Sequence, residues 1–323
     1  MTDPARIKEM ARPAGRGALP VPVFPGPGAS IPVPSVPALV VRTFGHGAVL
    51  IGDQEAQWHA ASARELFFYL LSFPEGRTRS EILEDLWGLD DNSASANRFR
   101  VTVHRLRSAL GRPDALGERF GRFHLSAEVF GATDVQTFYA ALSAAEHAGT
   151  PQERLAAYRQ VQALYTGDYL PELQTGWAGQ ARAEHQAAYV RACIALSALC
   201  CETSACEDAV TALTVALKID PFVGENHHQK LMTCLSVTQD QYVATEHYRR
   251  FIRFLRDDLG DTPMPETSAL AERVKCGEHI CERALSAEPH ARHAVPGPLQ
   301  GHRCPFSGDG SCPSGLIELT QLN

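Results

Sequence analysis

The sequence predicts a mainly α-helical protein with a small β component. Between about Asp134 and Ala287 the apolar residues recur at helical spacing, with turn residues at intervals that suit paired helices. Residues 38–131 instead mix short β-rich runs with short amphipathic helices. The flanks, 1–37 and 288–323, are rich in proline, glycine or histidine and have little apolar periodicity, which is typical of disordered segments. We therefore expect a Pro-rich leader, a mixed domain over 38–131, a helical domain over 132–287 and a His/Cys tail.

Composition places the chain among globular proteins. It has 323 residues, of which 44% are hydrophobic and 21% are charged, and its formal net charge is −7. This length suits two or three domains with buried cores. Residues 18–41 are uncharged but contain seven prolines, so they form no apolar membrane helix. The apolar run at 192–201 is about half of the roughly 20 residues that span a bilayer. We expect a cytoplasmic protein without a membrane partner.

The sequence contains nine cysteines. Five lie within the helical pattern, where small buried thiols are the simplest interpretation: Cys193, Cys200, Cys201, Cys206 and Cys234. The other four, Cys276, Cys281, Cys304 and Cys312, lie near histidines, but their spacing matches no standard zinc pattern. We expect no metal site, and whether the tail thiols take part in metal or redox chemistry stays open.

One predicted helix carries an unusual concentration of arginine. Its apolar residues recur at i, i+4, i+7 and i+11, on one face that packs against a core: Phe99, Val103, Leu106 and Leu110. The opposite face runs along Asn97, Val101, His104 and Ser108 and is flanked by Arg98, Arg100, Arg105 and Arg107. Such a face suits the major groove of DNA, where guanidinium groups reach phosphates or guanine. The alternative is an ordinary solvated helix surface.

The surrounding charge favours the DNA interpretation. From Asn97 to Leu125 there are seven arginines and two acidic residues, whereas from Asp53 to Asp91 there are nine acidic residues and three arginines. The domain is therefore electrically polarised although the whole chain is acidic. A local basic face is what phosphate binding requires, whatever the overall charge.

The neighbouring segments complete a recognisable motif. The run SARELFFYLLS predicts one helix, and Thr78 with Glu81 forms a capping box that starts a second helix ending near Trp87. Ser93 is a candidate N-cap for the arginine-rich helix. After that helix, the run ERFGRFHLS alternates as a β-hairpin does, with Phe123 and Leu125 facing inward. Three helices followed by a basic hairpin make a winged helix.

Residues 39 to about 131 resemble the OmpR/PhoB-type winged-helix DNA-binding domain, as it occurs in the Streptomyces antibiotic regulatory protein group of activators. The stretch LWGLDDNSASANRFRVTVHRLRSALG carries the likeness in its Leu-Trp-Gly, acidic loop, Ala-Ser-Ala-Asn and Arg-Leu-Arg-x-Ala-Leu-Gly elements. The resemblance implies that the helix from about Ser93 to Leu110 is the recognition helix.

The same resemblance implies a set of DNA-binding residues. They are the shared pair Arg105 and Arg107, the sequence-reading residues Asn97, Arg98, Arg100, Thr102 and His104, and Trp87 near the phosphate backbone. Val101 on the same helix face and Arg119 and Arg122 on the wing complete the predicted set. Where the group has a glycine before the aromatic residue of the wing, this chain has Arg122 before Phe123, which leaves the exact turn of the wing open.

The helical half resembles the bacterial transcriptional activator domain, a tetratricopeptide-like bundle that follows the winged helix in the same group. The likeness rests on Asp220-Pro221, Tyr248-Arg249-Arg250, Leu259-Gly260 and the turn with Pro263 and Pro265, and YTGDYLPEL with Trp177 fits its opening pair of helices. Helical periodicity alone predicts stacked helical hairpins, which usually present a protein-binding surface. Tyr248, Phe251, Phe254 and Leu255 are most simply core residues.

Two function classes follow. The first is a sequence-specific DNA-binding transcriptional regulator, an activator, whose helical domain serves self-association or signal input. Its expected partners are double-stranded DNA with directly repeated half-sites, RNA polymerase and a second copy on DNA. The alternative is a helical scaffold whose winged helix docks proteins. The sequence contains no Gly-x4-Gly-Lys-[Ser/Thr], His-Glu-x-x-His or Gly-x-Ser-x-Gly motif, so we expect neither an enzyme nor a cofactor.

Overall fold

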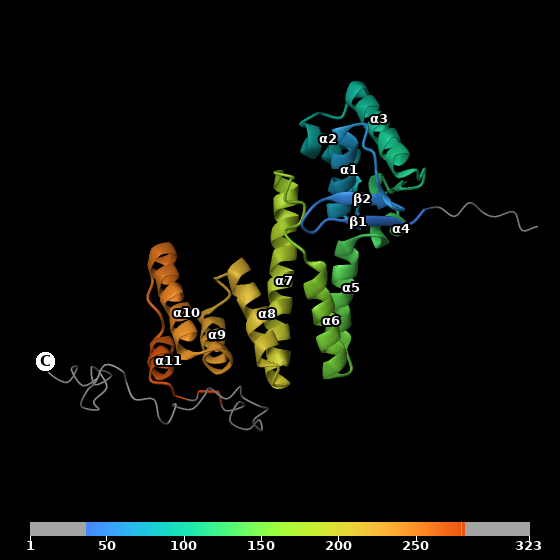
Figure 1. Ribbon diagram of the computed structural model, residues 1–323. Coiled ribbons are helices and arrows are strands. Elements are labelled where there is room, and N and C mark those ends of the chain that lie inside the picture. Colours follow the sequence, from blue (N-terminus) through green and yellow to red (C-terminus); the bar gives the residue numbers. More distant parts are fainter. Residues whose placement is uncertain (1–36, 279, 282–323) are drawn as a thin grey trace, which may run out of the picture. The chain divides into compact units, whose positions relative to one another are not determined.

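The first half of the chain folds into four helices, the last of them short, with two small sheets, as the run of short strands and helices predicts. A computed structural model describes residues 37–278, 280 and 281 (Figure 1). The strands of this half are β1 (Leu39–Arg42), β2 (Ala48–Ile51), β3 (Gln54–Glu55), β4 (Arg77–Thr78), β5 (Leu116–Arg119) and β6 (Arg122–Leu125). The helices are α1 (Ala61–Ser72), α2 (Arg79–Trp87), α3 (Ser93–Leu110) and the short α4 (Ala127–Gly131).

Both sheets are antiparallel and three-stranded. The order is β1-β2-β3 in the first sheet and β4-β6-β5 in the second. In the second sheet β4 pairs with β6 through Arg77 opposite Phe123, so the segment just before α2 holds the hairpin in place. Helices α1, α2 and α3, followed in sequence by the β5–β6 hairpin, form the predicted winged helix.

Local capping sets the boundaries of the winged-helix helices. Thr78 caps α2 and shares a reciprocal capping box with Glu81, as predicted. The N-cap of α3 is Asn92, whose side chain accepts hydrogen bonds from the backbone N–H groups of Ala94 and Ser95. The prediction of Ser93 as this cap was wrong by one residue, because Ser95 sits at the N3 position of the box that Asn92 begins.

The second half is a bundle of antiparallel helices. Its helices are α5 (Asp134–His147), α6 (Pro151–Leu164), α7 (Gly176–Glu202), α8 (Cys206–Ile219), α9 (Glu225–Thr238), α10 (Gln241–Phe254) with the π-helical turn η1 (Leu255–Leu259), and α11 (Pro265–Lys275). Figure 1 shows α5 to α11 packed as neighbours in sequence order, which is the arrangement of stacked helical hairpins. Tyr248, Phe251 and Leu255 are buried, as predicted, and Phe254 is half-buried.

The two halves share one hydrophobic core. Phe44, at the end of the first sheet, is 3% exposed, and its ring centroid lies 5.2 Å from that of Phe138 in α5 and 4.9 Å from that of Tyr165 after α6. Backbone hydrogen bonds join the same strand to the loop before α7, from Leu170 N–H to Thr43 O at 2.9 Å. The contacts that fix the first sheet therefore lie in the helical half.

Polar contacts across this junction are equally specific. The carboxylate of Asp134, the first residue of α5, accepts hydrogen bonds from the N–H of Thr43 at 2.7 Å, from its Oγ1 at 2.6 Å and from the N–H of Phe44 at 3.0 Å. Arg64 of α1 pairs with Glu172 at 2.8 Å. Glu172 also accepts from the N–H of Gly47, where a Cβ would lie 2.5 Å from its Oε1, so a larger residue there would displace the Glu172 side chain.

The mainly α fold with a winged helix before a tetratricopeptide-like bundle is confirmed. The last described helix, α11, stops at Lys275, and Gly277 follows with a φ of 73°. The helical pattern predicted from residue 282 to Ala287 lies outside the described residues. The predicted leader and tail lie outside the described residues, apart from Pro37, and the domain boundaries at 131 and 287 remain predictions. Within the described part of the chain, no helix is both long enough and apolar enough to cross a membrane.

Candidate DNA-binding surface

The outer face of α3 gathers the polar residues that the sequence places there. Phe99, Leu106 and Leu110 are at most 3% exposed and anchor the helix to the core. The opposite side leaves these side chains exposed: Asn97, Arg98, Arg100, Val101, His104, Arg105 and Ser108. Val101 is 40% exposed among these polar side chains. An exposed methyl group among polar side chains suits contact with a thymine methyl.

The arginines of this face keep their charge available. Within the described residues, Arg98, Arg100 and Arg105 make no ion pair with a carboxylate. Two nearby acidic residues are paired elsewhere, Asp85 with Arg77 at 2.9 Å and Asp91 with Arg79 at 3.0 Å. Glu65 of α1 interacts electrostatically with Arg98 but forms no close ion pair with it. Arginines near α2 are therefore paired with carboxylates, whereas the exposed arginines of α3 have no carboxylate partner among the described residues.

Two residues of the predicted set do not lie on this free face. Thr102 is 2% exposed, and its hydroxyl donates to the carbonyl of Arg98 at 2.9 Å, one turn back in the same helix. Arg107 is half-buried, and its Nη2 donates to the carbonyl of Leu116 at 2.7 Å, which ties α3 to the start of the hairpin. Thr102 is therefore positioned as a packing residue and Arg107 as a brace for the wing.

Trp87 and Arg98 form one unit at the end of α2. The guanidinium carbon of Arg98 lies 4.7 Å from the centroid of the Trp87 ring, an arrangement in which the ring face attracts the cation. The indole N–H of Trp87 is buried and has no hydrogen-bond partner among the described residues. The stacked ring limits the directions in which Arg98 can point, so the pair presents a preorganised cation beside the exposed face of α3.

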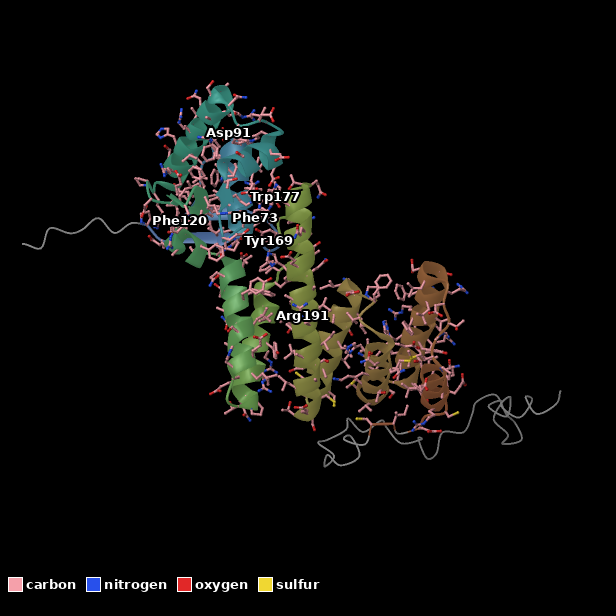
Figure 2. The ribbon with its side chains drawn as sticks, turned by 180° about the vertical axis from the view of Figure 1, so that it is seen from behind. Phe73, Asp91, Phe120, Tyr169, Trp177 and Arg191 are labelled. Atoms are coloured by element: carbon pink, nitrogen blue, oxygen red, sulfur yellow. The ribbon has the colours of Figure 1, made fainter. Side chains whose placement is uncertain are left out.

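A two-residue turn joins the two strands of the hairpin, and it settles the conformation of the wing turn that the sequence left open. Arg119 lies opposite Arg122 in the strand register, and the residues between them, Phe120 and Gly121, have φ angles of 53° and 73°. Two consecutive left-handed residues make the turn type that matches the twist of a hairpin. Phe120 is 92% exposed, and Figure 2 shows it on the outer side of the winged-helix half.

The two wing arginines differ in their surroundings. Arg119 is exposed, and its guanidinium carbon lies 5.2 Å from the ring centroid of Phe120. Arg122 turns toward the body of the domain, where Nη1 donates to the carbonyl of Gly76 at 2.7 Å and lies 3.7 Å from Glu81. Arg119 is therefore the free cation of the wing, whereas Arg122 holds the hairpin against the loop before α2.

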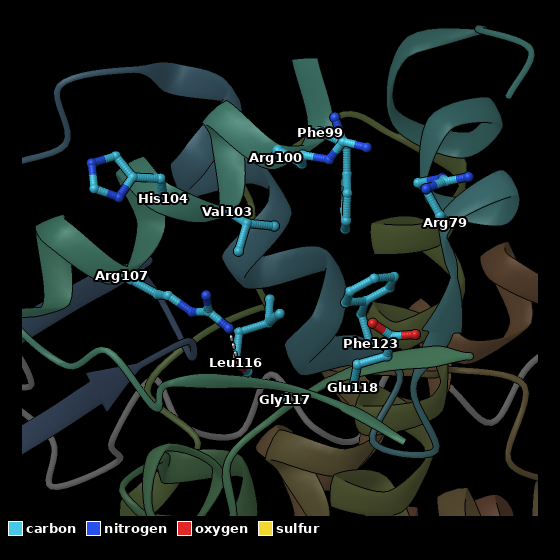
Figure 3. A pocket seen from close by; sticks show the side chains of 10 residues that line it. All are labelled: Arg79, Phe99, Arg100, Val103, His104, Arg107, Leu116, Gly117, Glu118 and Phe123. Carbon is cyan, nitrogen blue, oxygen red and sulfur yellow. Dashed lines mark hydrogen bonds between the residues drawn. The ribbon is translucent and has the colours of Figure 1, made fainter. Parts of the chain in front are cut away.

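A hollow of about 390 Å³ separates α3 from the hairpin (Figure 3). It is lined by Arg79, Phe99, Arg100, Val103, His104, Arg107, Leu116, Gly117, Glu118 and Phe123. Phe99 and Phe123 close its floor with ring centroids 4.7 Å apart. Cationic groups of α3 and a single carboxylate of the hairpin share its walls, so the hollow joins the helix face and the wing into one predominantly basic surface.

Sequence reasoning missed Phe120. Asn-Gly and Asp-Gly pairs predict a turn of this type, whereas Phe-Gly does not. An aromatic residue between two strand-like runs is usually assigned to the core. The glycine at position 121 was the available sign that the chain reverses there.

The architecture defines a class of proteins in which a winged helix with a basic recognition face precedes a stacked-helix domain. Residues 133–275 match the family described as bacterial transcriptional activator domain. The chain is 26% identical over 295 residues to the regulatory protein AfsR of Streptomyces griseus, covering 88% of this chain and 30% of that protein, so it spans less than a third of its relative.

A solved structure shares the fold. The structure of Mycobacterium tuberculosis EmbR in complex with a low-affinity phosphopeptide superposes with a TM-score of 0.63 at 20% identity, covering 77% of this chain and 68% of that one. At this identity the likeness establishes the fold alone. The chain therefore contains a bacterial transcriptional activator domain and, over most of its length, is similar to a Streptomyces regulatory protein.

Proposed function

We propose that the protein is a sequence-specific DNA-binding activator that reads the major groove with α3. The observation that carries the proposal is the outer face of α3, where three exposed arginines without carboxylate partners surround Asn97, Val101 and His104. Several unpaired cations on one helix face match the charge of a phosphate backbone, which a protein-docking face does not require. Asn97 and His104 can hydrogen-bond base edges, whereas arginine can fork onto guanine or reach phosphate.

The roles within this surface divide by position. Arg105 is exposed on the flank beside His104, and we assign it to a base contact. Arg119, on the wing, is assigned to the phosphate backbone, which it would contact in any sequence. The stacked pair of Arg98 and Trp87 serves the backbone at the other edge of the helix, and Arg100 lines the hollow toward the wing.

The helical half supplies the partner functions of the proposal. Helical hairpins stacked in sequence order present continuous side surfaces, which serve self-association, signal input or contact with RNA polymerase. Two copies docked head to tail on directly repeated half-sites would match the family that the chain resembles. The regulator named above is similar to this chain over the same two halves.

A salt titration of binding tests the proposal. The full chain is titrated against fragments of its own upstream genomic region, with random duplex as competitor. Three phosphate-reaching cations per copy (Arg98, Arg100 and Arg119) give a slope of log K against log salt of about −2.7, and two copies give about −5.4. A preferred fragment with a slope in this range supports the regulator. No binding at low salt would favour a winged helix that docks proteins.

Two substitutions separate the assigned roles. Arg105→Ala should weaken specific binding by about 1–3 kcal/mol and relax discrimination at one base pair, whereas Arg119→Ala should weaken specific and random DNA alike. Arg191→Ala, at an exposed arginine of α7 that Figure 2 shows away from the winged helix, is the matched control and should leave binding unchanged. Equal losses on specific and random DNA for Arg105→Ala would refute its assignment to a base.

A further inference from the structure

Two features of Phe120, at the tip of the wing, are unfavourable for the stability of the folded chain. Phe120 is 92% exposed, so its ring gains nothing from burial. Its φ of 53° lies in the left-handed region, which a bulky side chain rarely adopts and which costs of order 1–3 kcal/mol. Asparagine, aspartate or glycine would satisfy the same turn without strain. A strained, exposed aromatic residue at a hairpin tip indicates a role outside the chain.

The tip lies within reach of the groove beside the one that α3 faces. The hairpin begins at Leu116, which accepts the hydrogen bond from Arg107 of α3. From there to Arg119 the strand rises about 10 Å, and the side chain at the tip adds about 5 Å. Neighbouring major and minor grooves of a duplex are half a helical turn apart, about 17 Å. The reach of the hairpin therefore matches the separation of the two grooves.

The surroundings of Phe120 select nucleic acid as the occupant. Arg119 stacks on the ring, and the described residues provide no carboxylate that pairs with it. Across the hollow, Arg100 and Arg107 continue the positive surface toward α3. Proteins that bend DNA through the minor groove insert an apolar side chain such as phenylalanine between base steps and use arginine in the same groove.

We propose that Phe120 is such a wedge. It enters the minor groove next to the major groove read by α3, partly unstacks one base-pair step and bends the duplex, while Arg119 holds the adjacent phosphates. The proposal rests on the proposed function, and it adds a specificity device, because steps that unstack easily, TA and CA/TG, are then favoured at a fixed distance from the bases that α3 contacts.

The test uses the full chain and the genomic fragment that the wild-type protein selects. Phe120→Asn removes the wedge and places an Asn-Gly pair in the turn, the favoured sequence for this geometry, so the hairpin keeps its shape. Phe120→Leu retains an apolar wedge and is the matched control. Bending is measured by gel mobility of circularly permuted fragments, and unstacking by the fluorescence of 2-aminopurine placed at steps along the minor groove.

The expected results concern bending, affinity and salt dependence together. The wild-type protein and Phe120→Leu should bend the fragment by about 20° or more and raise 2-aminopurine fluorescence at one step. Phe120→Asn should lose both effects and bind about tenfold more weakly. Its salt slope should stay unchanged, because no charge is removed, whereas a displaced wing would lose the Arg119 contact and a slope of about 0.9.

Other outcomes overturn the proposal at identifiable levels. If wild-type protein selects a fragment but Phe120→Asn bends it equally, the wedge is wrong while DNA recognition by α3 stands. If the affinity falls together with the salt slope, Phe120 acts only by positioning the wing. If the wild-type protein selects no fragment, the proposed function fails and the wedge fails with it.

Discussion

Asp134 offers the most direct test of how the two halves are joined. Its carboxylate accepts three hydrogen bonds from the first sheet, two of them from Thr43, which is fully buried. Hydrogen bonds to a charged group contribute about 1.5–3 kcal/mol each, and water can replace part of them because Asp134 itself is half-buried. Asp134→Ala should therefore lower the free energy of unfolding by about 3–5 kcal/mol.

The isosteric change refines the expectation. Asp134→Asn keeps one accepting oxygen and loses the charge, so about half of that free energy should be lost. Glu266→Gln is the control. Glu266 also lies in the first turn of a helix, α11, and the substitution removes the same charge from an exposed position. The free energy of unfolding is measured by urea denaturation of the full chain, followed by circular dichroism.

Against a typical total stability of about 5–15 kcal/mol, the expected change is large enough to shift the denaturation midpoint clearly. A loss below about 1 kcal/mol for Asp134→Ala would refute the reasoning, because water would then serve Thr43 and Phe44 as well as the carboxylate does. A loss of the same size for Glu266→Gln would show that charge at a helix start, and not the junction, is what was measured.

Two further predictions concern stability. Arg107→Ala should lower the free energy of unfolding by about 1–3 kcal/mol, because it leaves the Leu116 carbonyl without its donor. Arg105→Ala, two residues away and exposed, should change it by less than about 0.5 kcal/mol, and equal urea midpoints for the two variants would contradict the bracing role. Burial lowers the pKa of His185 to about 4, from 6.5 for the free side chain, so the unfolded chain binds a proton first and stability falls as pH drops from 6.5 toward 4. The loss from this residue between pH 7.5 and pH 5 should be about 2 kcal/mol, and a His185→Gln variant whose stability falls as steeply as that of the wild type would show that the residue is not responsible.

The sequence predicts those features that depend on local periodicity. The apolar stripe of α3, the capping box at Thr78 and the exposed arginines all follow from residues within a few turns of each other. The junction could not be found in this way, since Thr43 and Asp134 are 91 residues apart and an acid at a helix start is ordinarily read as a cap. Arg107 illustrates the same limit, because helical spacing places it on the flank but its acceptor, Leu116, is in position only once the hairpin has folded.

The junction also limits how the protein can be regulated. Separating the winged helix from the bundle would break the Asp134 hydrogen bonds, at about 3–5 kcal/mol, and expose Phe44, at about 2–3 kcal/mol. The separated state would then be populated at about one part in 10⁴ or less, since each 1.4 kcal/mol is a factor of ten. A ligand could select that state only by binding it more than about 10⁴-fold more tightly.

A signal received by the bundle is therefore more effective if it leaves the junction intact. In that case α1 links α3 to the helical half. It packs against α3, and its Arg64 forms an ion pair with Glu172, so α3 would move together with the bundle. Self-association through the bundle would then set the spacing and direction of two recognition helices directly. Changing the assembly of copies, at the exposed surfaces of α5 to α11, costs none of the junction's free energy and is the route by which we expect regulation to act.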